Sequence, residues 1–353
     1  MPAPYDLTHE DLADLLAGEP SFRARQVWEG LHARVQRPDE MTELPASLRA
    51  ALEAALPPAL TEVDRRTADD GETTKWLWSL ADGVRVETVL MRYRDRVTVC
   101  VSTQAGCAMG CQFCATGQAG FQRHLSQGEI VEQVARAMRA AKPRRLSNVV
   151  FMGMGEPLAN YDRVWGAVLR LHGEMGLSAR HLTLSTVGIV PGIRRLSTEQ
   201  LPVNLAVSLH AANDALRDEL VPINRRYPLA TLADACTDYV AATGRRLSIE
   251  WALIDRVNDG GSDATELAAF ARPLGAHVNL IPLNPTPGYP VVGSPRARVR
   301  GFRDELTELG VNATVRLTRG VEIDAACGQL AAGAPGRAET GQGVRLVRGA
   351  QAR

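Results

Sequence analysis

Three cysteines lie close together in the segment Cys107-Ala-Met-Gly-Cys111-Gln-Phe-Cys114. The segment follows a run typical of a strand and contains glycine, so a loop can bring the three thiolates to one centre. Closed zinc sites and most iron-sulfur clusters use four protein ligands, and three thiolates therefore leave one coordination position open. A substrate or cofactor can bind the metal there. The spacing predicts a reactive metal or iron-sulfur centre on Cys107, Cys111 and Cys114.

The same cysteines have two other interpretations. His124 or a distant cysteine could complete a zinc site, and the segment would then be a structural zinc knuckle. Alternatively, the three thiols could be buried core residues without a metal, although packing alone does not require this spacing. A protein that contains zinc and no iron would favour the zinc knuckle.

Several polar residues follow apolar runs that are typical of strands. Gly155 and Glu156 come shortly after one such run, and Ser185 and Asn284 lie at the ends of two others. Barrel enzymes carry their reactive groups at the C-terminal ends of the strands, so we expect these side chains to converge. Taken singly, each also fits a turn or a capping residue. The full set of candidates for cofactor binding is Gly155, Glu156, Ser185, Ser208, Leu209, His210 and Asn284.

The elements that must position these residues alternate between two patterns. After Arg96, short β-rich runs alternate with segments of helical character, which predicts βα units on a parallel sheet or barrel. The first helix has a clear start, because Ser126 can cap it with Glu129 three residues later. Leu125 and Ile130 can form the apolar contact that often accompanies such a cap.

The first part of the chain has a different organisation. Apolar residues recur at helical spacing between residues 6 and 56, and three prolines divide this segment into short helices. From about Thr73, two strand-like runs flank Ala81-Asp82-Gly83, whose Asp-Gly pair is typical of a hairpin turn. A helical module therefore precedes a β extension.

Composition indicates an ordinary globular protein. Hydrophobic residues make up 45% and charged residues 23% of the 353 residues, which argues against disorder and fits one large domain with a smaller one. The formal net charge is zero, so an RNA-binding face would have to come from local arginine clusters, which fit solvated helix faces equally well. The candidate clusters are Arg23 with Arg25, Arg139 with Lys142, Arg144 and Arg145, and Arg296 with Arg298 and Arg300.

Two absences bear on location. The N-terminal segment has no basic stretch followed by an apolar one, and no apolar run approaches the roughly 20 residues that a membrane span needs. We therefore expect a cytoplasmic protein without membrane contact. The six cysteines are unevenly spaced in a long chain, which is unlike the disulfide framework of a small secreted domain.

The cysteine segment resembles the radical S-adenosyl-L-methionine (SAM) superfamily, whose C-x3-C-x2-C motif carries an aromatic residue, here Phe113, before the last thiol. The resemblance implies a [4Fe-4S] cluster on the three cysteines and SAM at the open iron. In such enzymes a Gly-Glu segment, here Gly155-Glu156, meets the methionine amino group of SAM.

The chain as a whole resembles the RlmN family, dual-specificity adenine C2-methyltransferases of 23S rRNA and tRNA, from the N-terminal helices through Leu330. Thr103, Ala105 and Leu283 differ from the residues more common in that family, and these departures concern local packing. The segments that match in order and spacing are Val86-Glu87-Thr88, Cys100-Val101-Ser102, Ala115-Thr116-Gly117-Gln118, GMGEPL at 153–158, SLHAAND at 208–214, LNPTPG at 283–288 and AACGQL at 325–330.

This resemblance implies roles for three further residues. Cys327 would take a methyl group from one SAM, and a 5'-deoxyadenosyl radical from a second SAM would activate that methyl for addition to adenine carbon 2. Glu87 would remove the carbon 2 proton, and Cys100 would attack the Cys327 sulfur to release the product with a disulfide. Without the resemblance, the two thiols read as buried core residues and Glu87 as a charged residue on a solvated strand face.

The resemblance also implies the architecture and the partners. We expect an α/β fold with a partial (β/α)6 radical SAM barrel at 96–333, a helical RNA-binding accessory domain at 1–60, a β-hairpin extension at 61–95 and a mobile tail at 334–353. Expected partners are 23S rRNA, tRNA and an electron donor such as flavodoxin, with the enzyme acting as a monomer. Two rivals are the adenine C8-methyltransferase of the same superfamily, which shares the catalytic residues, and a non-catalytic zinc-binding RNA module.

Overall fold

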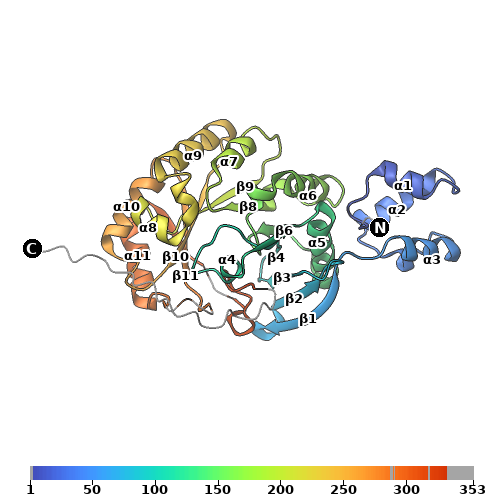
Figure 1. The fold of residues 1–353 in the computed structure, drawn as a ribbon, viewed down its shortest axis with the longest axis horizontal. Helices are drawn as coiled ribbons and strands as arrows, with labels where there is room; N and C mark the ends of the chain where they lie inside the picture. The colour runs from blue at the N-terminus through green and yellow to red at the C-terminus, as the bar shows by residue number, and fades with distance from the viewer. Residues whose placement is uncertain (1–2, 287–288, 290, 317–318, 332–353) are drawn as a thin grey trace, which may run out of the picture.

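Seven parallel strands form the centre of the computed structural model, in which residues 3–286, 289, 291–316 and 319–331 are described (Figure 1). The strands are hydrogen-bonded in the order in which they occur along the chain, from β4 to β12. The tail that the sequence predicts to be mobile lies outside the described residues. The strands are β4 (Val97–Cys100), β7 (Asn148–Phe151), β8 (Leu182–Thr186), β9 (Asn204–Ser208), β10 (Ser248–Leu253), β11 (His277–Pro282) and β12 (Asn312–Val315).

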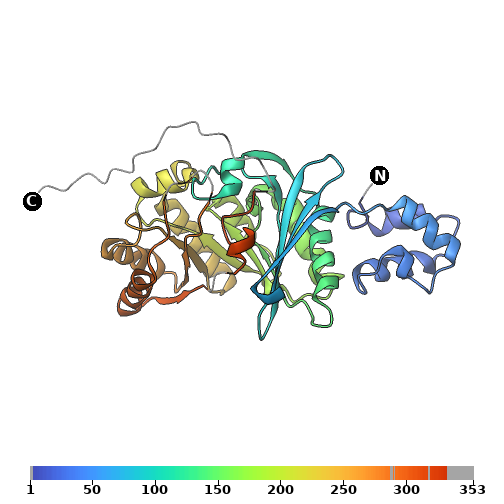
Figure 2. The ribbon, with the colours of Figure 1, turned by 90° about the horizontal axis from the view of Figure 1, so that it is seen from below.

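Helices between the strands lie on the outside of this curved sheet (Figures 1 and 2). The partial barrel expected from the sequence is confirmed, with β12 as a seventh parallel strand at its edge. The predicted start of the first long helix is also confirmed, because Ser126 Oγ accepts from Glu129 N at 3.1 Å. These helices are α5 (Gln127–Ala141), α6 (Tyr161–Gly173), α7 (Val190–Leu196), α8 (Asp214–Leu220), α9 (Leu229–Thr243), α10 (Gly261–Ala271) and α11 (Arg296–Glu308), with short 3-10 turns at Pro157–Asn160, Ala179–His181, Pro222–Arg225 and Val321–Ile323.

Three antiparallel strands extend the barrel sheet beyond β4. Strands β2 (Thr73–Ser79) and β3 (Arg85–Arg92) pair around the predicted Asp-Gly turn, and β3 pairs with β4. Strand β1 (Thr61–Ala68) pairs with β2 and lies within the β extension expected at 61–95, where only the two strands of a hairpin were predicted. Most of its residues are exposed, so it has no alternation of apolar and polar residues that could have revealed it.

The cysteine segment lies between β4 and α5. A small two-stranded sheet, β5 (Gln104–Gly106) with β6 (Phe121–His124), brackets it together with α4 (Ala115–Ala119). Gly106 has a φ of +74°, and a Cβ atom there would lie 1.8 Å from the carbonyl oxygen of Gly120. Only glycine fits this close approach, which closes the two ends of the cysteine segment onto each other.

The N-terminal helices have a hydrophobic core of their own. They are α1 (His9–Leu15), α2 (Phe22–His32) and α3 (Ala46–Ala55), with a 3-10 turn at Pro38–Glu40. Figures 1 and 2 show this module at one end of the molecule, beside α5 and α6. Its buried residues, which form a cluster separate from the barrel core, include Leu12, Val27, Trp28, Met41 and Leu52.

Polar contacts hold the module against the barrel. Arg139 of α5 grips the Glu40 carboxylate with both terminal nitrogens, one of them at 2.6 Å. This pairing lowers the pKa of Glu40 to about 2. Trp28 Nε1 donates to Glu174 Oε2 at 2.7 Å, which ties a second helix of the module to the end of α6.

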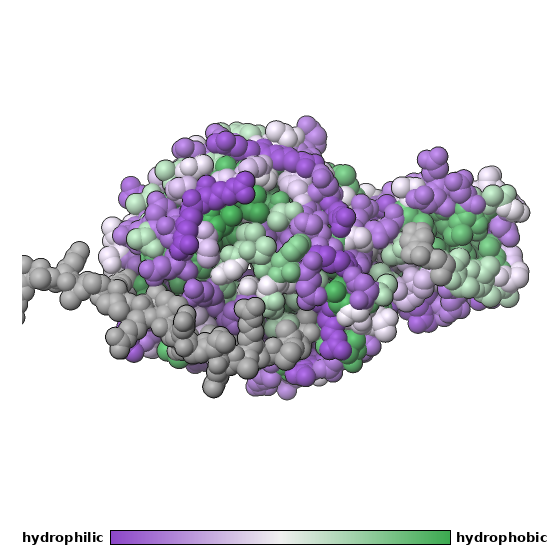
Figure 3. Space-filling model, viewed as in Figure 1, coloured by the Kyte–Doolittle hydropathy of each residue, from purple (hydrophilic) through white to green (hydrophobic). Residues whose placement is uncertain are grey.

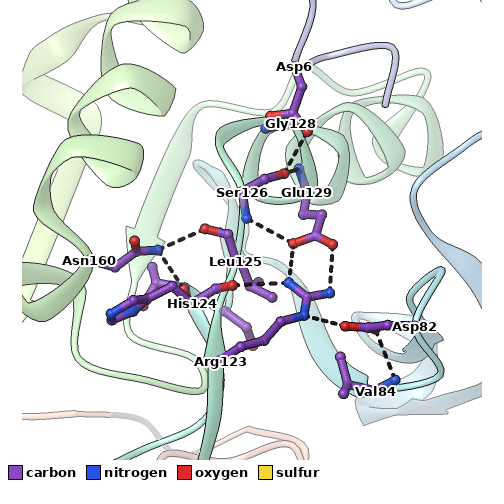
Figure 4. A network of polar contacts seen from close by, with 12 residues as sticks. Asp6, Asp82, Val84, Arg123, His124, Leu125, Ser126, Gly128, Glu129 and Asn160 are labelled. Atoms are coloured by element: carbon purple, nitrogen blue, oxygen red, sulfur yellow. Dashed lines mark hydrogen bonds and ion pairs between the residues drawn. The ribbon is translucent and has the colours of Figure 1, made fainter. Parts of the chain in front are cut away.

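The start of α5 joins the three parts of the chain (Figure 4). Arg123 binds both carboxylate oxygens of Glu129 at 2.8 Å and also contacts Asp82 in the hairpin turn. Asp6 accepts from Ser126 Oγ at 2.7 Å and from Gly128 N at 2.5 Å. The capping box therefore fixes the hairpin and the N-terminal segment as well as the helix itself. Across the described residues, no helix combines the length and apolar character that a membrane crossing needs.

Candidate active site

A cavity of about 160 Å³, called here the cluster chamber, lies at the C-terminal ends of the parallel strands. On the face viewed in Figures 1 and 3, apolar residues gather over the middle of the barrel and hydrophilic residues surround them. The structure brings most of the predicted site residues to this one chamber. Those that line it are Cys107, Cys111, Cys114, Gly155, Glu156, Ser185, Ser208, His210, Asn284 and Cys327.

The three clustered thiols share the chamber wall but are poor ligands in their protonated form. Burial raises the pKa of Cys107 to about 12, and burial together with the neighbouring thiols raises that of Cys111. A thiol must lose its proton to bind a metal, so the positive charge of a metal centre would have to offset this burial.

The donor set fits an iron-sulfur cluster with one open position. His124, the candidate fourth ligand for zinc, does not line the chamber, and its Nδ1 lies 3.0 Å from Gln104 Nε2. Within the described ranges, no three Cys, His, Asp or Glu side chains lie close enough to hold a single metal ion. A cubane binds each thiolate through a different iron, so its ligands need not surround one point.

Glu156 is a buried carboxylate aimed at the chamber from the loop after β7. Its Oε1 accepts from Leu158 N at 3.0 Å, and its Oε2 accepts from Val187 N at 2.9 Å. Burial is the largest influence on it and raises its pKa to about 7, against the opposing effect of these hydrogen bonds. A cationic group that entered the chamber would stabilise the charged form of this carboxylate.

The residues at the ends of β8 and β9 offer neutral polar groups. Ser185 Oγ and Ser208 Oγ lie 3.3 Å apart on neighbouring strands. Burial and Arg217 lower the pKa of His210 to about 3, so its ring is neutral. Ala252 N donates to His210 Nδ1 at 3.0 Å, which places the ring proton on Nε2. Leu209 points into the barrel core and does not line the chamber.

The segment that carries Cys327 is held from the barrel side by three contacts. Asn284 Nδ2 donates to the Cys327 carbonyl at 3.1 Å, and Gln329 Nε2 donates to the Pro285 carbonyl at 3.0 Å. Ala115 N, directly after the last clustered cysteine, donates to the Gly328 carbonyl at 2.7 Å. These contacts fix the backbone of Cys327 and of the residue after it in the wall of the cluster chamber.

Cys100 lies in a second, adjoining space. It lines a cavity of about 70 Å³, called here the thiol cavity, whose wall also includes Cys327 and Cys114. Cys100 is buried, and burial followed by the nearby Cys327 raises its pKa to about 12. Cys327 thus borders both the cluster chamber and the cavity that contains Cys100.

Glu87 does not line either cavity, although it lies on β3 two residues from Val89, the partner of Cys100 across the sheet. It is buried, with only 4% of its surface exposed, and is not on a solvated strand face. Lys75 Nζ binds its Oε1 at 3.1 Å, and Ala331 N donates to its Oε2 at 3.0 Å. In this conformation Glu87 holds the end of the Cys327 segment.

Sequence reasoning missed two charged residues at this site. Arg316 lines both the cluster chamber and the thiol cavity, and Glu250 lines the cluster chamber from β10. A charged residue in the otherwise apolar run of β10 is a signal that could have identified Glu250. Arg316 follows a short strand at the edge of the sheet, and its sequence context contains no comparable signal.

Several arginines of the candidate RNA-binding clusters form contacts within the protein. Arg139 binds Glu40, Arg145 donates to the Gly176 carbonyl at 3.1 Å, and Arg298 binds both oxygens of Glu305. Their charges are partly neutralised or used to fix loops, which weakens the case for phosphate contacts at these positions.

Comparison with known proteins places these features in context. A model of the Radical SAM superfamily matches residues 101–265. A Chloroflexus aurantiacus protein named "Probable dual-specificity RNA methyltransferase RlmN" is 54% identical over 346 residues, or 93% of this chain and 92% of that protein. A Salinispora tropica protein of the same name is 53% identical, over 94% of this chain and 92% of that protein. The crystal structure of a radical SAM methyltransferase from Sphaerobacter thermophilus has a TM-score of 0.90 and 51% identity, covering 94% of this chain and 99% of that chain.

Proposed function

The chain belongs to the RlmN family of radical SAM RNA methyltransferases, and from this premise we propose that it methylates carbon 2 of adenine in 23S rRNA and in tRNA. The observation that carries the proposal is the position of Cys327. It borders the chamber of the three clustered thiols and also the cavity that contains Cys100. In this proposal, Cys327 would carry the methyl-derived carbon and Cys100 would release it, beside the chamber proposed for the radical centre.

The cluster chamber supplies the groups that would hold the cofactors. Cys107, Cys111 and Cys114 would hold a [4Fe-4S] cluster, and Glu156 would pair with the amino group of SAM. The polar groups of Ser185, Ser208, His210 and Asn284 surround the remaining space. When bound, the cluster and SAM would supply an electron, a transferable methyl group and a carbon-centred radical.

Three protein side chains then have separate roles in the reaction at carbon 2. The Cys327 sulfur carries the methyl-derived carbon, which adenine cannot take directly because its carbon 2 is electron-poor and has no lone pair. Glu87 takes the carbon 2 proton, which requires one of its contacts with Lys75 or Ala331 to break. Cys100 attacks the Cys327 sulfur, so that a disulfide forms and the carbon–sulfur bond to the RNA breaks.

The remaining parts of the proposal concern partners. The N-terminal module would bind RNA, and the target adenine would have to be unstacked to reach the chamber, as in single-stranded or bulged RNA. A reduced carrier such as flavodoxin would supply electrons, and the enzyme would act as a monomer in the cytoplasm.

Product analysis tests this proposal. Anaerobically reconstituted enzyme is incubated with methyl-labelled SAM, a reductant and 23S rRNA, and the RNA is digested to nucleosides for mass spectrometry. We expect labelled 2-methyladenosine. Labelled 8-methyladenosine would overturn the assignment to carbon 2, and a protein that contains zinc and no iron, with unlabelled RNA, would overturn the radical reaction altogether.

SAM binding should depend on pH through Glu156. The carboxylate is charged above its pKa of about 7, whereas α-amino groups lose their charge above roughly pH 8. We expect the dissociation constant for SAM to be lowest between about pH 7 and roughly pH 8. Below about pH 7, where Glu156 becomes protonated, it should rise by up to about tenfold per pH unit. Equilibrium dialysis with cluster-bearing enzyme measures this.

Glu156→Gln should remove the acidic limb of that profile and weaken binding by about 10- to 100-fold, because a charged hydrogen bond is lost. Glu266→Gln is the matched control, since Glu266 binds Asn213 away from the chamber. A native affinity that does not change with pH would contradict the pairing of Glu156 with the amino group.

A further inference from the structure

Arg217 of α8 is a fully buried arginine that contacts the backbone directly after two strands of the barrel. Its Nη2 donates to the Val187 carbonyl at 2.6 Å, one residue after β8, and its Nε donates to the Leu209 carbonyl at 3.1 Å, one residue after β9. Its Nη1 donates to Asn224 Oδ1 at 2.8 Å. One guanidinium therefore joins the two loops that carry chamber residues.

The contact with Val187 fixes a residue that also binds Glu156. Val187 N donates to Glu156 Oε2 at 2.9 Å, while the carbonyl of the same residue accepts from Arg217. The next residue, Gly188, has a φ of +110°, and a Cβ atom there would lie 3.4 Å from Arg217 Nη2. The turn after β8 thus lies against the guanidinium, and the position of the amide that holds Glu156 depends on Arg217.

The contact with Leu209 fixes the residue before His210. His210 has a φ of +61°, a backbone conformation that costs free energy in residues other than glycine and needs support from its surroundings. Asn258 Nδ2 donates to the His210 carbonyl at 2.8 Å, and Arg217 holds the preceding carbonyl. The His210 ring, which lines the cluster chamber, is therefore placed by contacts on both sides.

The charge of Arg217 acts on neutral groups. Its hydrogen-bond partners are two backbone carbonyls and the Asn224 amide, which in turn donates to Asp214 Oδ1 at 2.8 Å and Asp218 Oδ1 at 2.7 Å. Burial lowers the pKa of Arg217 to about 10, so the guanidinium is charged at neutral pH. Hydrogen bonds from a charged donor are stronger than neutral ones, and a buried charge depends on them. The two carbonyls are therefore firmly held.

We propose that Arg217 is a positioning residue for SAM, which clamps the ends of β8 and β9 so that Glu156 and His210 are in place before SAM binds. The inference rests on the proposed function, in which Glu156 pairs with the amino group of SAM. A site that is already ordered binds more tightly, because less conformational freedom is lost on binding. Without the clamp, SAM would have to order both loops itself.

Amide hydrogen exchange of full-length, cluster-bearing protein without SAM tests the clamp directly. In Arg217→Met, the peptides that cover 186–189 and 208–211 should exchange at least about tenfold faster than in the native protein, because charged hydrogen bonds to both loops are lost. Peptides from α5 and α6 should keep their native rates, since the contacts of Arg217 do not reach these helices. Equally faster exchange throughout the chain would mean a general loss of stability and would overturn the clamp.

Equilibrium dialysis with labelled SAM measures the consequence for binding. Arg217→Met should raise the dissociation constant by about tenfold or more while the iron content stays native. In a Glu156→Gln background, the same substitution should raise it by only about threefold or less, because the amide that Arg217 positions no longer holds a charged carboxylate. Equal losses in the two backgrounds would show that Arg217 does not act through Glu156.

Two further variants complete the test. Arg217→Lys keeps the charge but has one nitrogen in place of three, so it cannot bind both carbonyls as arginine does and should give intermediate exchange and affinity. Should Arg217→Met fail to fold, native exchange and affinity in Arg217→Lys would overturn the role. Arg245→Gln is the matched control and should bind SAM with native affinity, because Arg245 Nη2 binds Asn204 Oδ1 at 2.8 Å, at the opposite end of β9.

Native SAM affinity in folded Arg217→Met protein would overturn the role of Arg217, whatever the exchange rates of the two loops. Failure of the proposed function looks different. In that case Glu156→Gln would bind SAM as tightly as the native protein, while the loops of Arg217→Met would still exchange faster.

Discussion

Cys327→Ala should abolish methylation of RNA, reducing the labelled nucleoside to background. The proposed reaction passes through a carbon attached to the Cys327 sulfur, and alanine has no atom that can take its place. The same variant should contain no methyl on the protein after incubation with labelled SAM, whereas the native enzyme should carry it on the peptide that includes Cys327. Intact-protein and peptide mass spectrometry measure both quantities.

The control for this variant is Cys236→Ala. Cys236 is a fully buried thiol on α9, on the outer side of the barrel strands, and does not line the cluster chamber or the thiol cavity. Both variants remove one thiol and should keep the same iron content. Substantial RNA methylation by Cys327→Ala, at the rate of Cys236→Ala, would rule out Cys327 as the carrier.

Cys100→Ala should trap the enzyme on its RNA. The proposed release step needs a second thiol near the Cys327 sulfur. Cys100 shares the thiol cavity with Cys327, and Cys114, the other thiol that lines this cavity, is assigned to the cluster. Methylation of Cys327 and attack on adenine do not use Cys100, so the reaction should proceed and stop at the covalent adduct. Multiple turnover should fall to at most a single equivalent of RNA per enzyme.

Denaturing gels show the adduct as a slower protein band that ribonuclease treatment collapses. After digestion, the Cys327 peptide should carry the mass of a methylene-linked adenosine. Recovery of only free, methylated RNA from Cys100→Ala would remove Cys100 from the release step. Loss of iron from this variant would instead show that the substitution damaged the nearby cluster site, so the iron content must be measured in parallel.

Glu87 shows that the position of a residue in the sequence does not by itself define its role in the protein. A carboxylate on an apolar strand looked like a solvated charge, and the family resemblance made it a candidate base. The structure buries it and uses both its oxygens, one for Lys75 and one for Ala331 N. A substitution of Glu87 would therefore loosen the end of the Cys327 segment as well as remove a base, and the two effects have to be separated.

Features that depend on residues close together in the chain could be predicted from the sequence. The spacing of Cys107, Cys111 and Cys114 predicts a ligand set because one loop carries all three. The Asp-Gly turn and the capping box of Ser126 with Glu129 likewise depend on residues a few positions apart, and both are present in the structure. The alternation of strands and helices gave the barrel, since each βα unit is recognised within its own segment.

Only the tertiary structure decided which distant residues meet. Cys100, on β4, and Cys327, in the segment after β12, line the same cavity, and no local pattern of residues encodes that meeting. The neighbours of strand β1 and of Arg316 are likewise set by the order and register of the strands in the sheet, so the sequence did not reveal them. The sequence by itself therefore determined the chemistry of the one loop that carries the clustered cysteines. Which other thiols and charged residues lie near that loop was decided only when the strands were placed side by side.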